Sequence, residues 1–336
     1  MAVRTDGLRT AWRALGGREG EGWQTIPVSI GAPCTLFAGR RLPGGEEAVL
    51  IGFHNMRSLP DSHLPQGHGF EVVRLHADPT GANRLVVALA RKVGGSLELF
   101  TMMAEDLVNL LDDCAAADEG EALRRFLGRI RAWQDFMDRH REGVLSAESE
   151  QGLFGELVLL DCMLEAGVPA RQLIEAWQGP MDGLHDFMFG TGGVEVKTSL
   201  STSGFRATVT SLDQLDDSQR QPIFVAAIRL AIHSSGRTLP EMADAIMAKL
   251  RGSPVSLEMF EVNLMRAGLL PGTAGHYTRR FLHASTVVLA VQESFPRLTR
   301  ANVPPAIRNV RYEIDLDLAG AEDVGLQRAL ALLGVV

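Results

Sequence analysis

Apolar and polar residues alternate with a short period through the first hundred residues of the chain. Together with turn-forming stretches such as "LPGGEE" and "DPTGAN", the alternation predicts short β-strands. The predicted strands cover residues 34–38, 48–53, 70–75, 84–90 and 96–100. The period then lengthens to that of a helix, and two helices are predicted around Met103–Cys114 and Leu123–Met137, with "DEGE" as their linker. The first part of the chain is therefore expected to be rich in β-strands and to end in two helices.

Helical and strand patterns are mixed in the second half of the chain. Helices are predicted over residues 147–166, where Gly167 supplies the stop, around Asp213, and over 239–250 and 257–267. Two strands flank the turn in "HDFMFGTGGVEVKTS", and others cover residues 206–210, 223–232, 281–291 and 310–316. This mixture predicts an α/β (α+β) domain with a mixed central sheet flanked by helices. The polar stretch 141–150 is the expected boundary, which gives a β-rich domain over 1–145 and a second domain over 146–336.

Composition narrows the class of protein. The chain has 336 residues, of which 46% are hydrophobic and 22% charged, as in ordinary globular proteins. No apolar run approaches the roughly 20 residues that span a bilayer, so we expect no membrane segment. Cys34, Cys114 and Cys162 lie far apart and lack metal-ligand spacing. These features predict a cytoplasmic protein without a disulfide framework or a zinc site.

Charge is unevenly distributed along the chain. The formal net charge of −8 argues against a protein that simply coats nucleic acid. Between Arg266 and Arg311, however, seven arginines accompany a single acid, Glu293. Either these arginines form a local basic face that contacts phosphates, or they are scattered over a solvated surface. Strand alternation also sends Arg280 and His283 to opposite faces, so not all of the basic residues can line one groove.

The hairpin in the middle of the chain carries the candidate chemistry. On its second strand Val194, Val196 and Thr198 point to one face, while Glu195 and Lys197 point to the other. Asp186, on the first strand, can share the face of Glu195 if the register of the hairpin allows it. The alternative is a buried ion pair with no catalytic role.

A further carboxylate lies on the helix before the hairpin. Glu156 falls on the apolar stripe of Leu153, Leu157, Leu160 and Leu164. An acid on a buried helix face is costly unless it has a partner. Gly152 and Gly155 flank it and allow the helix to approach another backbone closely. A stripe misphased by one residue would instead make Glu156 an ordinary surface acid.

Two or three carboxylates near one lysine form a recognisable set of reactive groups. Crowded carboxylates repel each other, and a bound Mg²⁺ relieves the repulsion because it prefers hard oxygen ligands. A lysine beside the metal can orient the attacking water and stabilise charge on a phosphate. Glu156, Asp186, Glu195 and Lys197 therefore predict hydrolysis of a phosphodiester.

Asp186…Glu195-Val196-Lys197 resembles the PD-(D/E)XK motif of restriction-endonuclease-like nucleases. The similarity is stronger to one bacterial family, long described only as a domain of unknown function and labelled "PD-(D/E)XK motif protein". The strings that carry it are "GLFGELVLL", "WQGP", "HDF", "EVKTS", "SLDQL", "ESFPRL" and "YEIDL", and most lie between Gly152 and Leu298. The resemblance implies a restriction-endonuclease-like core that acts on DNA with Mg²⁺, for which Mn²⁺ can substitute.

The resemblance also implies roles for single residues. Asp186, Glu195 and the carbonyl of Val196 would be metal ligands, and Glu156 would be an additional acid. Lys197 would be the catalytic lysine, and Gln214 would help to align the site, unless it is an exposed residue early in a helix capped by Ser211. His185 stands where the motif has proline, and we expect a structural role for it.

The implied setting is a bacterial anti-phage defence locus that also encodes a MutL-like ATPase, a Z1 helicase-like protein and an abortive-infection phage-resistance protein. A Mg²⁺-dependent DNA endonuclease, the effector of such a system, is the predicted function. The alternative is a catalytically weak or inactive nuclease-fold scaffold or DNA-binding subunit. Neither sequence preference nor oligomeric state follows from the sequence.

Overall fold

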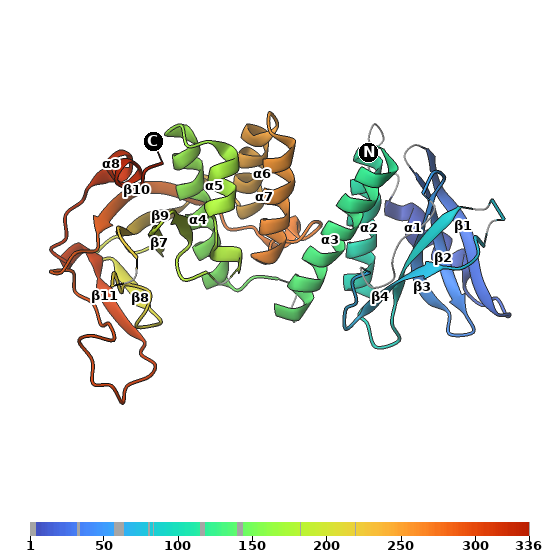
Figure 1. Cartoon of the computed structure of the whole chain (residues 1–336), viewed down its shortest axis with the longest axis horizontal. Helices are drawn as coiled ribbons and strands as arrows, with labels where there is room; N and C mark the ends of the chain where they lie inside the picture. The colour runs from blue at the N-terminus through green and yellow to red at the C-terminus, as the bar shows by residue number, and fades with distance from the viewer. Residues whose placement is uncertain are drawn as a thin grey trace. The chain divides into compact units, whose positions relative to one another are not determined.

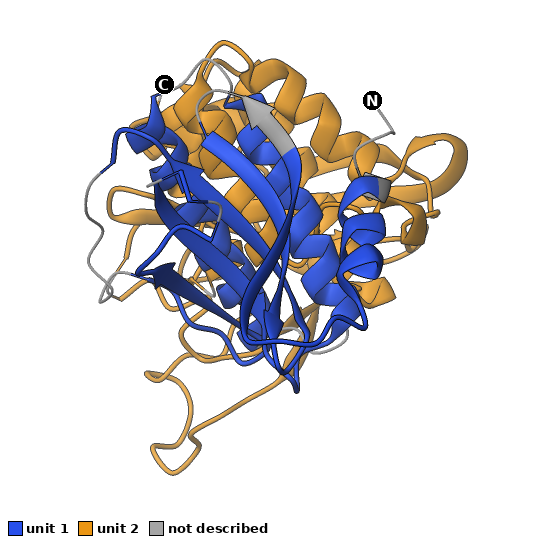
Figure 2. Cartoon of the chain, turned by 90° about the vertical axis from the view of Figure 1, so that its right-hand side faces the viewer, with its two compact units in different colours: residues 1–143 blue, residues 144–336 orange. Residues whose placement is uncertain are grey.

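The computed structural model describes residues 5–31, 34–56, 64–79, 81–82, 84–114, 118–139, 144–181, 183–218 and 220–335. The chain divides into two compact units, residues 1–143 and 144–336, shown in separate colours in Figure 2. The division falls inside the polar stretch 141–150. No helix among the described residues has the length and apolar character needed to cross a membrane.

The first unit contains a five-stranded antiparallel sheet and three helices. The sheet has the strand order β1-β2-β3-β5-β4. Its strands are β1 (Gly22–Gly31), β2 (Cys34–Leu42), β3 (Glu46–Phe53), β4 (Phe70–Leu75) and β5 (Leu85–Arg91), and its helices are α1 (Thr5–Leu15), α2 (Leu97–Asp113) and α3 (Glu119–Arg139). The four strands predicted between residues 34 and 90 are present, and α1 and β1 are additional.

Two details predicted for the first unit are wrong. Residues 96–100 do not form a strand, because Ser96 caps α2 by accepting a hydrogen bond from the Leu99 N–H at 3.4 Å. Phe100, Met103 and Leu107 are buried at helical spacing, and this period overrides the brief alternation of Leu97 and Leu99. "DEGE" is not a linker, because α3 begins at Glu119 and Asp118 accepts from the Glu121 N–H at 2.7 Å.

The second unit is built on a four-stranded mixed sheet with the order β10-β9-β7-β6. β7 and β9 are parallel, and the other neighbours are antiparallel. The strands are β6 (Phe187–Phe189), β7 (Gly192–Ser199), β9 (Ile223–Arg237) and β10 (Phe281–Ala290), and β8 (Arg206–Val209) pairs with β11 (Tyr312–Asp315) in a separate ribbon. The predicted mixed sheet is present, and the predicted hairpin forms one side of it, with β6 as the edge strand.

Helices cover one face of this sheet (Figure 1). They are α4 (Ala147–Glu165), α5 (Ala170–Ala176), α6 (Leu239–Leu250) and α7 (Pro254–Arg266), with α8 (Gly325–Leu332) beside β10 and single 3₁₀ turns at Gly179–Met181, Ala274–His276 and Leu316–Leu318. The larger core lies between these helices and side chains such as Val194, Val196 and Phe224. A second core, which includes Val225 and Ala227, lies on the opposite face with β8 and β11. The α/β fold class is thereby confirmed.

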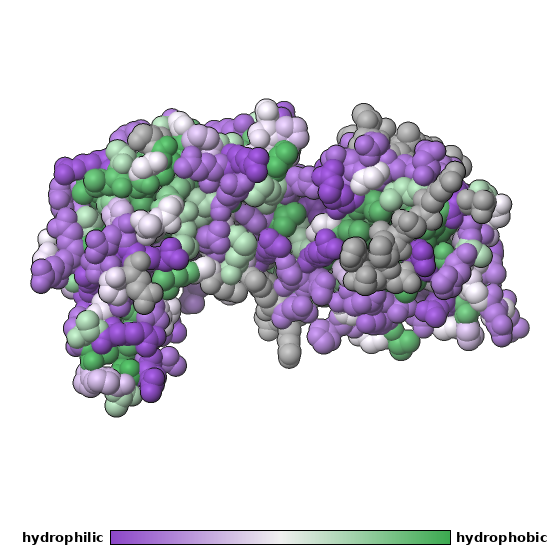
Figure 3. Space-filling model, viewed as in Figure 1, coloured by the Kyte–Doolittle hydropathy of each residue, from purple (hydrophilic) through white to green (hydrophobic). Residues whose placement is uncertain are grey.

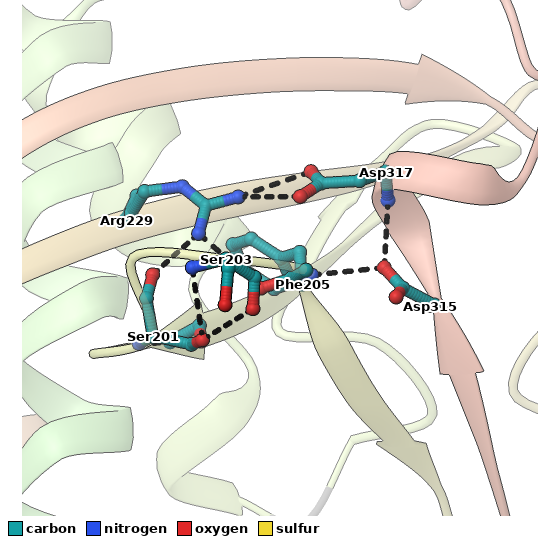
Figure 4. A network of polar contacts seen from close by, with 8 residues as sticks. Ser201, Ser203, Phe205, Arg229, Asp315 and Asp317 are labelled. Atoms are coloured by element: carbon teal, nitrogen blue, oxygen red, sulfur yellow. Dashed lines mark hydrogen bonds and ion pairs between the residues drawn. The ribbon is translucent and has the colours of Figure 1, made fainter.

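A polar network fixes the β8–β11 ribbon to the central sheet (Figure 4). Arg229 on β9 donates to the carbonyls of Ser201 and Gly204 and pairs with Asp317 at 2.9 Å. Asp315 accepts from the Phe205 N–H at 2.9 Å. The segment that leaves β7 and the segment that leaves β11 are thus held to the same strand.

One helix predicted in the second unit does not form. The residues around Asp213 make turns, and Ser211 accepts from the Gln214 N–H at 3.2 Å without starting a helix. Serine can cap either a helix or a single turn, and this stretch has no apolar stripe that would extend it. The turn places Gln214 beside the hairpin.

Candidate active site

Glu195 and Lys197 lie side by side on β7, as the strand alternation predicts. The register pairs them with Val225 and Ala227 of β9, whose side chains belong to the second core. Lys197 Nζ donates to Glu195 Oε1 at 2.7 Å. Only 4% of Glu195 is exposed, so this ion pair lies at the base of the site rather than on its surface.

Asp186 directly precedes β6 and lies beside a part of β7 that has no pairing with β6. The β6–β7 ladder ends at the pair Phe187 and Val194, so the backbone of Val196 finds no strand partner on that side. Instead, the Val196 N–H donates to Asp186 Oδ2 at 2.7 Å. Asp186 is therefore held against β7 by a hydrogen bond to its side chain. Strand register alone does not predict this contact.

The carbonyl of Val196 points to the same side as its N–H. In a strand the N–H and C=O of one residue point to the same neighbour, and residues two apart repeat the direction. Thr198, two residues further on, has its carbonyl on the α4 side, where Gln151 Nε2 donates to it at 3.1 Å. The Val196 carbonyl is accordingly directed toward the Asp186 side of β7, where a ligand oxygen would be needed.

Glu156 reaches the same place from α4. A β-carbon on Gly179 would stand 2.4 Å from Glu156 Oε2 and 3.2 Å from Asp186 Oδ1. A side chain at position 179 would therefore force the Glu156 carboxylate to shift, and glycine lets the backbone lie close to both carboxylates. Glu156 Oε2 also accepts from Trp177 Nε1 at 2.8 Å. The off-pattern acid of α4 is thus a neighbour of Asp186.

Gln214 and His185 complete the surroundings of Glu195. Gln214 Nε2 donates to Glu195 Oε1 at 2.6 Å, and Gln214 Oε1 accepts from the Thr210 N–H at 3.1 Å. The ring of His185 is buried, and its Nε2 lies 2.9 Å from the Gln214 carbonyl. A β-carbon on Gly193 would stand 2.7 Å from His185 Nδ1, so the ring packs directly on the β7 backbone. His185 therefore supports the turn that carries Gln214.

Burial raises the pKa of all three carboxyls, and the charge of Asp186 adds to the effect at Glu195 and Glu156. Burial and the charge of Asp186 raise the pKa of Glu195 to about 8, although Lys197 opposes them. Burial raises the pKa of Asp186 to about 6 against the hydrogen bond from Val196. Burial and Asp186 also raise the pKa of Glu156 well above its usual range. The site therefore tends to hold protons where three negative charges would otherwise meet.

The donor set fits a hard divalent cation. Each carboxylate engages one oxygen with a protein donor, namely Asp186 Oδ2, Glu195 Oε1 and Glu156 Oε2, and its second oxygen has no such bond to another described residue. Among the described residues, however, no group of three or more His, Cys, Asp or Glu side chains is placed so that it could hold a metal ion as it stands. The three carboxylates and the Val196 carbonyl are nevertheless hard oxygen donors, the ligand type that Mg²⁺ prefers.

Sequence reasoning missed two contributors to this site. The indole of Trp177, to which the sequence analysis assigned no role in the site, donates to Glu156 while its ring lies 5.6 Å from that of Phe260. A buried indole N–H needs an acceptor, and this requirement is the signal that could have found it. The second is Gly179, whose closeness to the carboxylates of Glu156 and Asp186 no local sequence pattern indicates.

The comparison with known families agrees with this geometry. A family described as "Putative PD-(D/E)XK family member, (DUF4420)" matches residues 8–317. The chain belongs to this family. The match extends over both units, so the β-rich first unit is part of what the family shares. Searches of curated proteins and of solved structures found no match.

Proposed function

We propose that this PD-(D/E)XK family member is a Mg²⁺-dependent DNA endonuclease. The observation that carries the proposal is the meeting of Glu156, Asp186 and Glu195 beside Lys197 at the unpaired edge of β7. Three buried carboxyls with raised pKa values destabilise the folded state, because their burial is not fully compensated. Such a cluster is typical of a functional site. A bound divalent cation would offset this cost, and Mn²⁺ can take the place of Mg²⁺.

Each side chain has a separate task in the proposed reaction. Asp186, Glu195, Glu156 and the Val196 carbonyl would hold the metal, which supplies an activated water and neutralises charge on the phosphate. Lys197 orients that water and stabilises the negative charge that develops as the water attacks phosphorus and the bond to the leaving oxygen breaks. Gln214 holds Glu195 Oε1 in place. Trp177 does the same for Glu156 Oε2.

Cleavage of duplex DNA with added Mg²⁺ tests this function. We expect wild type to cut, and Asp186→Ala and Lys197→Ala to reduce the rate by at least about 100-fold, because each removes a group of the reacting centre. Lys249→Ala is the matched control, since Lys249 pairs with Asp161 and Glu165 away from the site. Equal cleavage by all four proteins would assign the activity to a contaminant or to another site.

A scaffold with little or no catalysis is the second candidate. It is favoured by the net charge of −8 and by carboxylates that already bond to protein donors. Calorimetric titration with Mn²⁺ separates the two candidates. Binding at sub-millimolar concentration, lost in Asp186→Ala, supports the nuclease, and no heat of binding at millimolar Mn²⁺ supports the scaffold.

We further propose that the nuclease is the effector of a bacterial anti-phage defence system. The support is the resemblance described above, with its MutL-like ATPase, Z1 helicase-like protein and abortive-infection protein as partners. Phage plating on cells that carry such a complete set tests the role. Protection should be lost when the chain carries Asp186→Ala, and protection that survives the substitution would contradict an effector role.

A further inference from the structure

Residues 291–311, which join β10 to β11, form a long segment without helix or strand, called the arm here. It extends away from the body of the second unit beyond β8 and β11 (Figure 1). Its charged residues are four arginines and one acid. In Figure 3 strongly hydrophilic side chains are visible on this projection beside a few apolar ones, and Leu298 and Ile307 are exposed.

The base of the arm is fastened to the turn that carries Gln214. Arg297, which is largely buried, donates to the Leu215 carbonyl at 2.6 Å and pairs with Asp217 at 2.9 Å. Arg300 pairs with Asp213 through two bonds of 2.7 and 2.8 Å. The arm thus begins next to the residue that holds Glu195.

A second attachment joins the arm to the ribbon near the lysine. The Leu298 N–H donates to the Tyr312 hydroxyl at 3.0 Å. Burial raises the pKa of Tyr312, and the charges of Arg297 and Lys197 act in the opposite direction. Tyr312 is therefore close enough to Lys197 to experience its charge, and the base of the arm borders the candidate active site.

The outer part of the arm carries two arginines that, unlike Arg297 and Arg300, have no acid partner among the described residues. Arg308 and Arg311 are exposed, and neither has an ion pair or hydrogen bond with another described residue. Arg279, Arg280, Arg297 and Arg300 each have an acid partner. The basic stretch is thus not one continuous face: its paired members stabilise the fold, and the exposed charge is concentrated on the arm.

We propose that the arm is a DNA-binding element, and that Arg308 and Arg311 contact the phosphate backbone of the DNA that the neighbouring site cleaves. The inference rests on the proposed nuclease function. An exposed arginine without an acidic neighbour is available to a phosphate, with which it can form paired charge-assisted hydrogen bonds. A loop that only connected β10 to β11 would not need the bonds by which Arg297 and Arg300 fix its base beside Gln214. An element that positions DNA at the site does need such a fixed base.

Salt dependence of DNA binding tests the arm directly. Binding of a labelled 30-bp duplex is measured by anisotropy in EDTA, so that no cleavage occurs, at a series of salt concentrations. Each lost phosphate contact lowers the slope of log affinity against log salt by about 1. Arg308→Ala/Arg311→Ala should therefore reduce the slope by about 2 and weaken binding at least about tenfold at low salt.

The matched control removes two charges elsewhere in the same unit. Arg171 is exposed and pairs only with Glu175 on α5, and Arg251 is exposed at the end of α6. Arg171→Ala/Arg251→Ala changes the net charge equally and should leave the slope unchanged. Equal slopes for wild type and both variants would overturn the proposal, as would a wild type that does not bind DNA at low salt.

The cleavage assay separates failure of the arm from failure of the proposed function. If wild type cleaves and Asp186→Ala does not, the function stands, and the arm variant should raise KM with little change in kcat. An unchanged KM would reject the arm while the function holds. If wild type never cleaves but binds DNA with an arm-dependent slope, the nuclease fails and the arm stands. Circular dichroism of both double variants should match wild type, because neither pair of side chains is buried.

Discussion

At the residue scale, Glu195 has the environment that most clearly sets it apart from an ordinary acid. It is buried, it bonds to Lys197 and Gln214, and its pKa is raised to about 8 by burial and by Asp186. A free glutamate releases its proton near pH 4.5. Between these two values the folded protein keeps a proton that the unfolded chain has lost.

The free energy of unfolding of the metal-free protein should therefore fall as the pH rises from about 5 to 8. The folded state binds more protons than the unfolded state in this window, so stability decreases with pH, by an amount on the order of a few kcal/mol. Urea unfolding in EDTA at several pH values measures it. Glu195→Gln should flatten the profile, and Mg²⁺ should stabilise wild type most at high pH. Parallel profiles for wild type and Glu195→Gln would show that another group is responsible.

Trp177 should contribute to metal affinity through Glu156. Trp177→Phe keeps an aromatic ring against Phe260 but removes the donor to Glu156 Oε2. Loss of such a supporting bond typically weakens metal binding by about 10-fold or more, and Mn²⁺ calorimetry would detect it. Trp133→Phe is the matched control, because Trp133 is also fully buried and donates to Asp106 in the first unit. If both variants weaken binding equally, the loss reflects general destabilisation.

At the element scale, the approach of α4 to β7 decides where Glu156 lies. A β-carbon on Gly155 would stand 2.1 Å from Thr198 Oγ1, whereas one on Gly152 would meet nothing within 4 Å. Both glycines were predicted to let α4 approach another backbone; Gly155 packs closely, but against the Thr198 side chain, and the prediction is wrong for Gly152. Within one turn of α4, close packing therefore restricts position 155 but not position 152.

Gly155→Ala should therefore destabilise the protein by about 1–3 kcal/mol, because overpacking forces α4 away from β7. Gly152→Ala should stabilise it by up to about 1 kcal/mol, since alanine has the higher helix propensity. In a Thr198→Ala background the cost of Gly155→Ala should largely disappear. Chemical unfolding of wild type, Gly155→Ala, Thr198→Ala and the double variant measures this double-mutant cycle. A cost that persists without the threonine side chain would place the clash elsewhere.

At the scale of the whole molecule, every candidate site residue lies in the second unit. Glu156, Asp186, Glu195, Lys197 and Gln214 all fall between residues 144 and 336, together with the two cores that position them. The first unit has its own sheet and its own cores, one of them on β2, β3 and β5. The family match nevertheless includes both units.

The fragment 144–336 should fold cooperatively by itself and bind Mn²⁺ within about threefold of the affinity of the full chain. The core and the ligand oxygens of the site all come from residues 144–336, which form one compact unit. Thermal unfolding and calorimetry check both points. A fragment that is folded but does not bind metal would instead show that the first unit completes the site.

Local sequence patterns were enough to predict most of the helices and strands near the site and the direction of their side chains. Period-2 alternation put Glu195 and Lys197 on one face of β7, and period-3.6 phasing turned Glu156 inward, because these directions follow from local backbone geometry. Local patterns failed at residues 96–100 and around Asp213, where a serine can serve a helix or a turn equally well. The contacts that complete the site depend on packing instead: Asp186 accepts from Val196 because β6 ends early, Gly179 lies close to two carboxylates, and Trp177 donates to Glu156. These contacts join segments that are distant in the chain, and their distances depend on the packing of helices on the sheet, which no single stretch of sequence contains.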